Sequence, residues 1–359
     1  MKPPPSAGRN NCFDLIRLVL ALVVLLAHVS LYGGFGWDWT RSLTKESISI
    51  ASLAVLGFFG LSGFLISASC ASLLEEPRGS LSFLRRRFLR IMPGFWSCQL
   101  ITVFIACPLI ATLRGHPLSL QDFRAPNGAF DYLLNNWWLQ IKQYQITSVT
   151  DGAPYGAMNG SLWSLFPEAI CYLLTLALAL LGGLRENRWL AVVLLGFVAT
   201  LNIINFGNEA YYGPTAIVLN RWYEPLSSYF TGMVVFCFRD KINFQGWPVA
   251  VFFGALLVFL ARFGGLMLFA PLFIPLVLLS LGQLAVVHVK HDLSYGIYIY
   301  SSVVLQLFAA VQFIHSRYWL YLVCSLVTTT AIAAFSWKFI ESPCIRFGRT
   351  RPSKRGASA

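Results

Sequence analysis

The stretch FDLIRLVLALVVLLAHVS, residues 13–30, is apolar enough to cross a lipid bilayer, yet it carries two ionisable side chains, Arg17 and His28. A bilayer-spanning helix needs about 20 mostly apolar residues. An arginine at the centre of such a helix costs roughly 2.5–3.5 kcal/mol on insertion scales, so ionisable groups there usually face a partner, a cavity or water. The stretch therefore predicts a membrane helix with a polar surface on one side.

The rest of the chain has the same composition. Of its 359 residues, 57% are hydrophobic and only 12% are charged, whereas a typical soluble protein carries about 25% charged residues. The fold class predicted is all-α: a polytopic integral membrane protein of about ten transmembrane helices. The ten candidate spans are residues 13–33, 49–71, 91–111, 161–181, 189–206, 224–238, 246–262, 266–287, 293–313 and 318–340.

The net charge of +12 follows the topology of the chain and does not indicate a nucleic-acid partner. Most lysines and arginines fall in alternate connections and at the two ends, so the positive-inside rule predicts that both termini are cytoplasmic. Residues 1–345 are predicted to form the membrane domain, and the basic tail 346–359 is predicted to be disordered. The first span lacks a small-residue cleavage site after it, so we interpret it as a membrane helix and not as a signal peptide.

Arg17 and His28 lie 11 residues apart, so on a helix they share one face and are separated by about 16 Å along the axis. Arg17, near the cytoplasmic end, could simply extend to the lipid headgroups. His28 lies too far across the membrane for that, and we interpret it as functional.

A second intramembrane group is Glu168, in NGSLWSLFPEAICYLL, residues 159–174. Helix geometry places it in the outer half of the membrane, at a depth similar to that of His28. A carboxylate there needs a cation or a hydrogen-bond donor as its partner. A purely structural buried pair is the alternative.

Two further motifs face the predicted interior. GFFGLSGFLI, residues 57–66, carries a strip of small residues that suits close helix packing, or else a path for a thin ligand beside Ser62 and Gly63. FLRRRFLRIMPGFW, residues 83–96, places Arg87 and Arg90 on one helix face, where two guanidiniums could bind phosphates. A basic cluster that only sets the topology is the alternative.

The long outer connection, residues 112–160, contains Trp137 and Trp138. Tryptophans collect at the membrane surface, so an interfacial aromatic belt is one interpretation. The other is a ledge on which sugar rings stack.

The ordered set of motifs resembles the acyltransferase-3 family of multispan membrane acyltransferases. The matching pieces are Arg-x10-His from Arg17 to His28, FFGLSGFLI, Arg-x-x-Arg-Ile-x-Pro from Arg87, and SLWSLxxE from Ser161 to Glu168. Weaker echoes occur in LSYGIYIYS, residues 293–301, and ESP, residues 341–343. Many members of the family have a histidine where this chain has Ser301, so any role of that histidine is absent or replaced here.

The resemblance implies an enzyme that moves an acyl group, commonly acetyl, from cytosolic acetyl-CoA or another acyl-CoA to a hydroxyl. The acceptor would be a glycan such as lipopolysaccharide O-antigen, exopolysaccharide or a lipid-linked sugar, and the enzyme would be located in the bacterial inner membrane. We expect His28 to act as the general base, since an imidazole with an unperturbed pKa near 6.5 accepts a proton at neutral pH. Acyl-CoA would be a substrate, with neither a resident cofactor nor a metal. The remaining assignments are Glu168 and Arg17 for catalysis, Arg87, Arg90, Ser62 and Gly63 for acyl-CoA, and Asn159, Ser161, Trp163, Trp137 and Trp138 for the acceptor.

A competing interpretation is a proton-coupled transporter of a small metabolite or lipid-linked sugar, because intramembrane Arg, His and Glu also describe a proton pathway. Such transporters often contain internal repeats. The two halves of this sequence show no convincing repeat, which favours the enzyme.

Overall fold

The computed structural model describes residues 11–36, 48–206, 214–242, 246–287 and 289–348, apart from the side chains of residues 205–206 and 214–221. The regular structure of these residues is helical, and η1 and η4 are π-helical turns while η2 is a 3₁₀ turn. In chain order the elements are α1 (Phe13–Gly33), α3 (Ile50–Leu73), α4 (Gly79–Ile101), η1 (Thr102–Ala106), α5 (Cys107–Leu113), α6 (Leu120–Arg124), α7 (Ala129–Asn135), η2 (Gly160–Ser164), α8 (Leu165–Leu180), α9 (Trp189–Phe206), α10 (Pro214–Phe238), α11 (Trp247–Phe263), α12 (Leu266–Gly282), α13 (Ser294–Ala309), α14 (Gln312–His315), α15 (Tyr318–Ser336), η4 (Trp337–Glu341) and α16 (Ser342–Gly348).

Each of the ten predicted spans overlaps helical structure, although the helix bounds differ from the predicted ones in several places. Five continuous helical segments are long and apolar enough to cross a membrane: Phe13–Gly33, Ile50–Leu73, Gly79–Leu113, Gly160–Leu180 and Tyr318–Gly348. Shorter apolar helices cover Trp189–Ile204, Trp247–Phe263, Leu266–Gly282 and Ser294–Ala309. The all-helical, multipass architecture is therefore confirmed, while the count of ten spans and the cytoplasmic termini stay predictions.

Residues of the sequence set several helix ends directly. Ser49 caps the start of α3, where its hydroxyl accepts a hydrogen bond from the Ser52 amide at 3.1 Å. Helix α1 ends at Gly33, and the capping residue Gly34 has a φ of 62°, in the left-handed region that glycine tolerates. Gly264 and Gly265, with φ of 111° and 88°, form the tight turn between α11 and α12.

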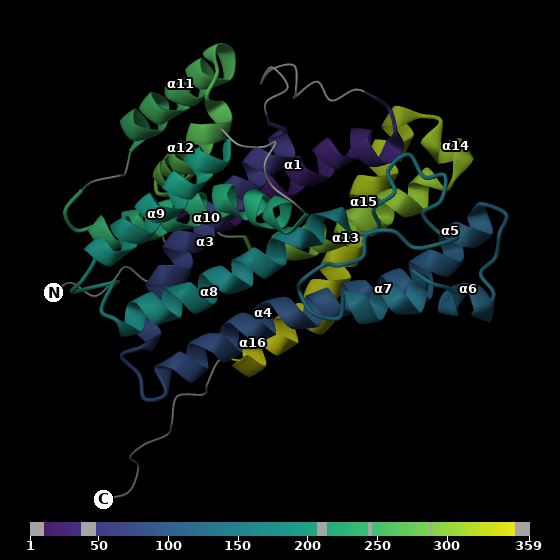
Figure 1. Cartoon of the computed structure of the whole chain (residues 1–359), viewed down its shortest axis with the longest axis horizontal. Coiled ribbons are helices and arrows are strands. Elements are labelled where there is room, and N and C mark those ends of the chain that lie inside the picture. Colours follow the sequence, from purple (N-terminus) through teal and green to yellow (C-terminus); the bar gives the residue numbers. More distant parts are fainter. Residues whose placement is uncertain (1–10, 37–47, 207–213, 243–245, 288, 349–359) are drawn as a thin grey trace, which may run out of the picture.

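The long helices lie side by side in one bundle (Figure 1). Helix α3 is central and packs against α1, α8, α10 and α12, while α13 packs against α1 and α15. The C-terminal ends of α3 and α8 and the start of α4 meet at one end of the bundle, on the left of Figure 1, and the α5–α7 segment and α14 lie at the other.

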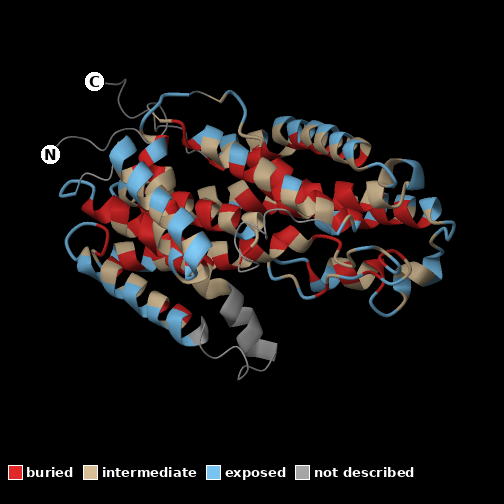
Figure 2. Cartoon of the chain, turned by 90° about the horizontal axis from the view of Figure 1, so that it is seen from above, coloured by how far each residue is buried: buried red, intermediate tan, exposed pale blue. Residues whose placement is uncertain are grey.

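Figure 2 shows the buried residues inside the bundle and the exposed ones on its outside. The outside is largely apolar and the interior partly polar, as expected for a protein solvated by lipid. Large apolar side chains on the long helices are exposed: among them Leu26, Phe104, Leu173, Phe197, Phe252, Val258, Val327 and Phe335. Buried polar residues include Gln99, Thr102, Asn159, Ser161, Ser302 and Glu341. Such a distribution would be unfavourable in water, so it supports the assignment to the membrane.

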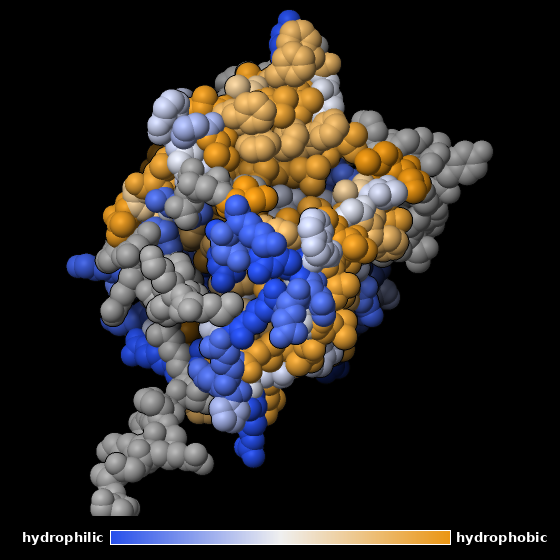
Figure 3. Space-filling view, turned by 90° about the vertical axis from the view of Figure 1, so that its left-hand side faces the viewer, coloured by the Kyte–Doolittle hydropathy of each residue, from blue (hydrophilic) through white to orange (hydrophobic). Residues whose placement is uncertain are grey.

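One end of the bundle is rich in arginine, and we call it the basic end. Figure 3 views this end and shows hydrophilic residues gathered at its centre, with hydrophobic residues above them and to their right. Arg185 pairs with Glu75, and Arg188 donates to Asp240 at 2.8 Å, so both pairs join neighbouring helix ends. Their positions agree with the segments that the positive-inside rule assigns to the cytoplasm.

The glycine face of α3 is a packing surface. A Cβ built on Gly63 would lie 1.9 Å from the Tyr229 carbonyl oxygen of α10, and one built on Gly60 would lie 2.5 Å from Pro275 of α12. In the opposite direction, a Cβ on Gly232 would meet the Gly60 oxygen at 2.0 Å. The helices therefore touch through their backbones, as small-residue membrane interfaces do. These contacts support the packing alternative for Gly63, while a role of this face in guiding acyl-CoA stays a prediction.

Candidate active site

Two polar groups occupy the interior of the bundle, and the first surrounds His28 of α1. The Ser161 hydroxyl of η2 lies 3.5 Å from His28 Nδ1 and 3.0 Å from the Ser302 hydroxyl of α13. The Tyr32 ring, one turn beyond His28, packs edge-on against the imidazole with ring centres 5.6 Å apart. We call His28, Ser161, Ser302 and Tyr32 the His28 group. It brings together two predicted site residues, His28 and Ser161.

Glu168 does not share the depth of His28, which corrects the expectation from helix geometry. Tyr32 Oη accepts a hydrogen bond from the Gly160 amide at 3.1 Å, so η2 begins inside the bundle, level with the His28 group. Glu168 follows Ser161 by seven residues, roughly 10 Å nearer the basic end at 1.5 Å per residue. The two depths would match only if the helix started at the membrane surface.

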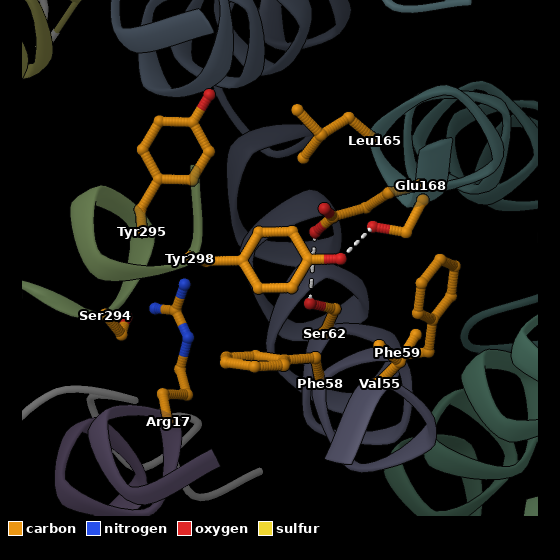
Figure 4. A pocket seen from close by; sticks show the side chains of 11 residues that line it. Arg17, Val55, Phe58, Phe59, Ser62, Leu165, Glu168, Ser294, Tyr295 and Tyr298 are labelled. Carbon is orange, nitrogen blue, oxygen red and sulfur yellow. Dashed lines mark hydrogen bonds between the residues drawn. The ribbon is translucent and has the colours of Figure 1, made fainter. Parts of the chain in front are cut away.

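Glu168 has two hydroxyl partners. Its Oε1 accepts hydrogen bonds from Tyr172 Oη at 2.5 Å and from Ser62 Oγ at 3.2 Å. The expectation that the carboxylate needs a donor is thus confirmed, and the donors come from one turn along α8 and from α3. Ser62, predicted to bind the coenzyme, therefore lies beside the predicted catalytic carboxylate (Figure 4).

Ser62 and Glu168 line a narrow cavity of about 50 Å³. Arg17 lies next to Ser294 at the end of the cavity that is nearer the basic end of the bundle. The aromatic rings of Phe58 and Tyr298 form the cavity walls (Figure 4). Its other lining residues are Val55, Phe59, Ser164, Leu165 and Tyr295. A cavity of this size holds a few water molecules. A thioester arm therefore needs side chains to move before it can occupy the space.

Tyr298 separates the cavity from the His28 group. Its hydroxyl donates to the Ser161 carbonyl oxygen at 2.7 Å and lies 2.7 Å from the Ser164 hydroxyl. Its ring packs edge-on against Phe58, with ring centres 5.8 Å apart. Tyr298 therefore contacts both the cavity and the η2 turn that carries Ser161.

The second polar group lies where α1, α4, η4 and the connection before α13 meet, and we call Arg17, Arg90, Asp292 and Glu341 the mouth cluster. Asp292 Oδ2 lies 3.1 Å from Arg17 Nη1 and 2.5 Å from Arg90 Nη2. Glu341 Oε2, from the π-helical turn η4, lies 3.8 Å from Arg90 Nη1. Burial alone would raise the pKa of Asp292, but the two guanidiniums and hydrogen bonds from Ser294 hold it below its usual range.

Arg87 and Arg90 do not form one phosphate site. Arg90 is engaged by carboxylates and lies between the Tyr295 and Trp337 rings, 5.7 Å from each centre. Arg87 has its guanidinium 5.9 Å from the Phe83 ring, and its buried Nε has no hydrogen-bond partner in the described part of the chain. Only Arg87 therefore fits the prediction of a cation that awaits an anion.

Asn159 belongs to a buried amide network and not to a substrate surface. Its side-chain nitrogen donates to Tyr132 Oη at 2.7 Å, Thr102 Oγ1 at 3.0 Å and Gln99 Oε1 at 3.3 Å. The network joins α4, η1, α7 and η2, and Thr102 opens the π-helical turn. With its donors engaged and no exposed surface, Asn159 is better explained as a structural residue.

The positions of Trp137 and Trp138 are those expected for an interfacial aromatic belt. Trp137 stacks on Trp96 of α4 with ring centres 5.6 Å apart, and Trp96 Nε1 donates to the Trp137 carbonyl at 3.0 Å. Trp138 is 65% exposed. Neither lines the cavity, and Trp163 is a half-buried residue packed against the core. No described contact joins these three rings to His28.

Sequence reasoning missed three residues of the interior: Asp292, Tyr298 and Tyr172. Tyr172 could have been found from its i, i+4 spacing to Glu168. Tyr298 lies in the motif LSYGIYIYS, and Asp292 immediately precedes it. Ser301, at the place of the family's histidine, donates to the Tyr298 carbonyl at 3.2 Å, and its neighbour Ser302 reaches Ser161 instead.

Comparisons with known proteins identify the family of the chain. The model of the acyltransferase-3 family, described as an acyltransferase domain, matches residues 10–338. The chain is 27% identical over 352 residues to the O-acetyl transferase of Shigella phage Sf6, covering 93% of this chain and 95% of that protein. It is 26% identical over 390 residues to nodulation protein 10 of Rhizobium leguminosarum bv. viciae, covering 98% and 97%. No solved structure matches.

Proposed function

The chain belongs to the acyltransferase-3 family and is an O-acetyltransferase, and from this premise we propose that it moves acetyl from cytosolic acetyl-CoA to a glycan hydroxyl, with His28 as general base. The observation that carries the proposal is the row of polar side chains inside an apolar bundle. The row runs from Arg17 through Ser62 and Glu168 to Ser161 and His28.

The donor approaches from the basic end, which the positive-inside rule makes cytoplasmic. Acetyl-CoA carries phosphates at one end and the thioester at the end of a long thin arm. Arg87, which has no carboxylate partner among the described residues, attracts the phosphates, and Arg17 lines the cavity behind them. The arm then follows the cavity past Ser62 and Glu168, and Tyr298 turns aside from Ser161.

The acetyl transfer needs one proton acceptor and one site for developing negative charge. His28 removes the proton from the acceptor hydroxyl as its oxygen attacks the thioester carbonyl. The carbon–oxygen bond forms and the carbon–sulfur bond breaks, and the coenzyme A thiolate leaves and takes the proton from His28. In this proposal the Ser161 and Ser302 hydroxyls, which lie 3.0 Å apart, donate to the carbonyl oxygen as its charge develops.

The acceptor reaches the His28 group from the opposite face of the bundle, where glycans are assembled outside a bacterial inner membrane. O-antigen, exopolysaccharide and lipid-linked sugars all present the required hydroxyls. The His28 group lies near that face, because Gly33 ends α1 five residues after His28.

The proposal is tested by acetyl transfer in isolated membranes. Labelled acetyl-CoA is supplied to wild type, His28→Ala and the control His116→Ala, which changes an exposed histidine in the connection after α5. We expect label in the polysaccharide or lipid-linked sugar fraction for wild type and His116→Ala, and none for His28→Ala at equal protein level.

Equal labelling by His28→Ala would remove His28 from the chemistry. Absence of label with wild type would show that the donor or acceptor is wrong, and would favour the proton-coupled transporter.

A further inference from the structure

Asp292 holds the position that an incoming anion would take in the mouth cluster. Four donors surround its carboxylate: Arg17 Nη1 at 3.1 Å and Arg90 Nη2 at 2.5 Å on Oδ2, and Ser294 Oγ at 2.5 Å and the Ser294 amide at 3.3 Å on Oδ1. Two guanidiniums, a hydroxyl and a backbone amide are also the donors that typically bind a phosphate. The side chain of Asp292 therefore occupies a complete anion site.

With Asp292 in place, carboxylates already engage both guanidiniums of the mouth cluster. Asp292 pairs with Arg17 and with Arg90, and Glu341 lies 3.8 Å from the other side of Arg90. An anion that approached this arrangement would have to compete with the Asp292 carboxylate for the same donors. It gains the two guanidiniums only if Asp292 withdraws.

Asp292 is also the member of the cluster that is not part of a helix. It lies in the connection between α12 and α13, whereas Arg17 belongs to α1, Arg90 to α4 and Glu341 to η4. Arg90 is held further by Tyr295 and Trp337 and by Glu341 on its other side. Displacing Asp292 leaves Arg90 with a carboxylate partner and leaves Arg17 facing the cavity, as seen in Figure 4.

We propose that Asp292 is a resident counter-ion for the anion site of Arg17, Arg90 and Ser294, and that a phosphate of the acyl-CoA displaces it when the donor binds. This inference rests on the proposed function. Before the donor arrives, Asp292 compensates two partly buried cations that would otherwise be costly. After the donor binds, the released carboxylate turns to the solvent at the basic end.

The test is the affinity for free coenzyme A of the full-length protein in lipid nanodiscs, measured by calorimetry. Asp292→Asn keeps the size of the side chain and its carbonyl acceptor but removes the competing charge. We expect it to bind coenzyme A about tenfold more tightly than wild type, as expected when a charge worth about 1.4 kcal/mol stops competing. The control Asp240→Asn removes one carboxylate at the same end, from the exposed pair with Arg188, and should change the affinity less than twofold.

Unchanged or weaker binding by folded Asp292→Asn, or an equal gain for Asp240→Asn, would overturn the inference. If Asp292→Asn does not fold, labelling of wild type by a carbodiimide and an amine decides, because displacement releases the Asp292 carboxylate to the solvent. Labelling of Asp292 should increase when coenzyme A is added, and unchanged or lower labelling would refute displacement. Failure of wild type to bind coenzyme A at all would instead refute the proposed function and this inference with it.

Discussion

Replacing Gly63 by alanine tests whether the glycine face of α3 packs or binds a ligand. A Cβ at this position would lie 1.9 Å from the Tyr229 carbonyl oxygen, 2.8 Å from its carbonyl carbon and 3.1 Å from the Met233 amide nitrogen. Real Cβ contacts are essentially never shorter than 3.0 Å, so the two backbones must separate by at least 1.1 Å, from 1.9 to 3.0 Å. Since every obstructing atom is backbone, no side chain can relieve the clash.

Gly57→Ala is the matched control on the same helix. Its Cβ would meet the methyl ends of Leu278 at 2.7 Å and Leu20 at 3.0 Å, which can rotate away. The gain in helix propensity from glycine to alanine is common to both variants and cancels in the comparison. Overpacking typically costs about 1–3 kcal/mol. We therefore expect Gly63→Ala to be less stable than Gly57→Ala by roughly this amount.

Thermal unfolding in detergent measures the difference. One kcal/mol shifts the midpoint by about 2–4 °C in domains of 150–250 residues, so Gly63→Ala should unfold several degrees below Gly57→Ala. The apparent KM for acetyl-CoA should be similar in the folded fractions of both. Equal midpoints together with a raised KM in Gly63→Ala would refute the packing argument and restore the ligand path.

Three further changes separate structural from functional roles. Asn159→Ala leaves several buried donors and acceptors without partners, at a cost of about 1–3 kcal/mol for each. The unfolding midpoint should therefore fall, while the acceptor KM of the remaining folded enzyme stays unchanged. A raised acceptor KM without loss of stability would show that Asn159 binds the acceptor. Trp138→Ala should leave acceptor KM within about twofold if the ring belongs to the interfacial belt, and a rise of tenfold would indicate the sugar ledge. Because the pKa of Asp292 is held below its usual range, its ion pairs stabilise the fold fully above about pH 4 and lose this effect as the pH falls further. The midpoint difference between wild type and Asp292→Asn should accordingly be constant from pH 5 to 8 and shrink below pH 4, and a change between pH 6 and 8 would show that another group titrates.

The positions of the helices could be predicted because a membrane span has one dominant signal, a run of apolar residues of the right length. Residues 13–33 coincide with α1, and residues 189–206 with α9. The span predicted at 224–238 is only part of α10, which begins at Pro214. Polar residues there, among them Asn220 and Arg221, interrupt the apolar run but not the helix.

The site was predicted less completely, because depth along a helix depends on where neighbouring segments enter the bundle. His28 and Ser161 were both selected, but their contact depends on η2 starting beside Tyr32. Hydropathy does not indicate how far inside the bundle a segment such as η2 begins. Asp292 was missed for a related reason: a carboxylate just outside an apolar run looks like an ordinary loop residue until the helices bring two arginines to it.

The mouth cluster also shows why the arginines of a membrane enzyme's anion site need carboxylate partners. Burying a guanidinium without an anion costs free energy, so a carboxylate that pairs with Arg17 and Arg90 stabilises the protein before a phosphate binds. A permanent carboxylate on a helix, such as Glu341, stabilises the fold but permanently weakens attraction for the ligand. A carboxylate in a connection, such as Asp292, compensates the cations and can still leave. The affinity for acyl-CoA is then set by how much more strongly these donors bind the phosphate than the Asp292 carboxylate. Asp292 is therefore the residue to mutate first, before the arginines.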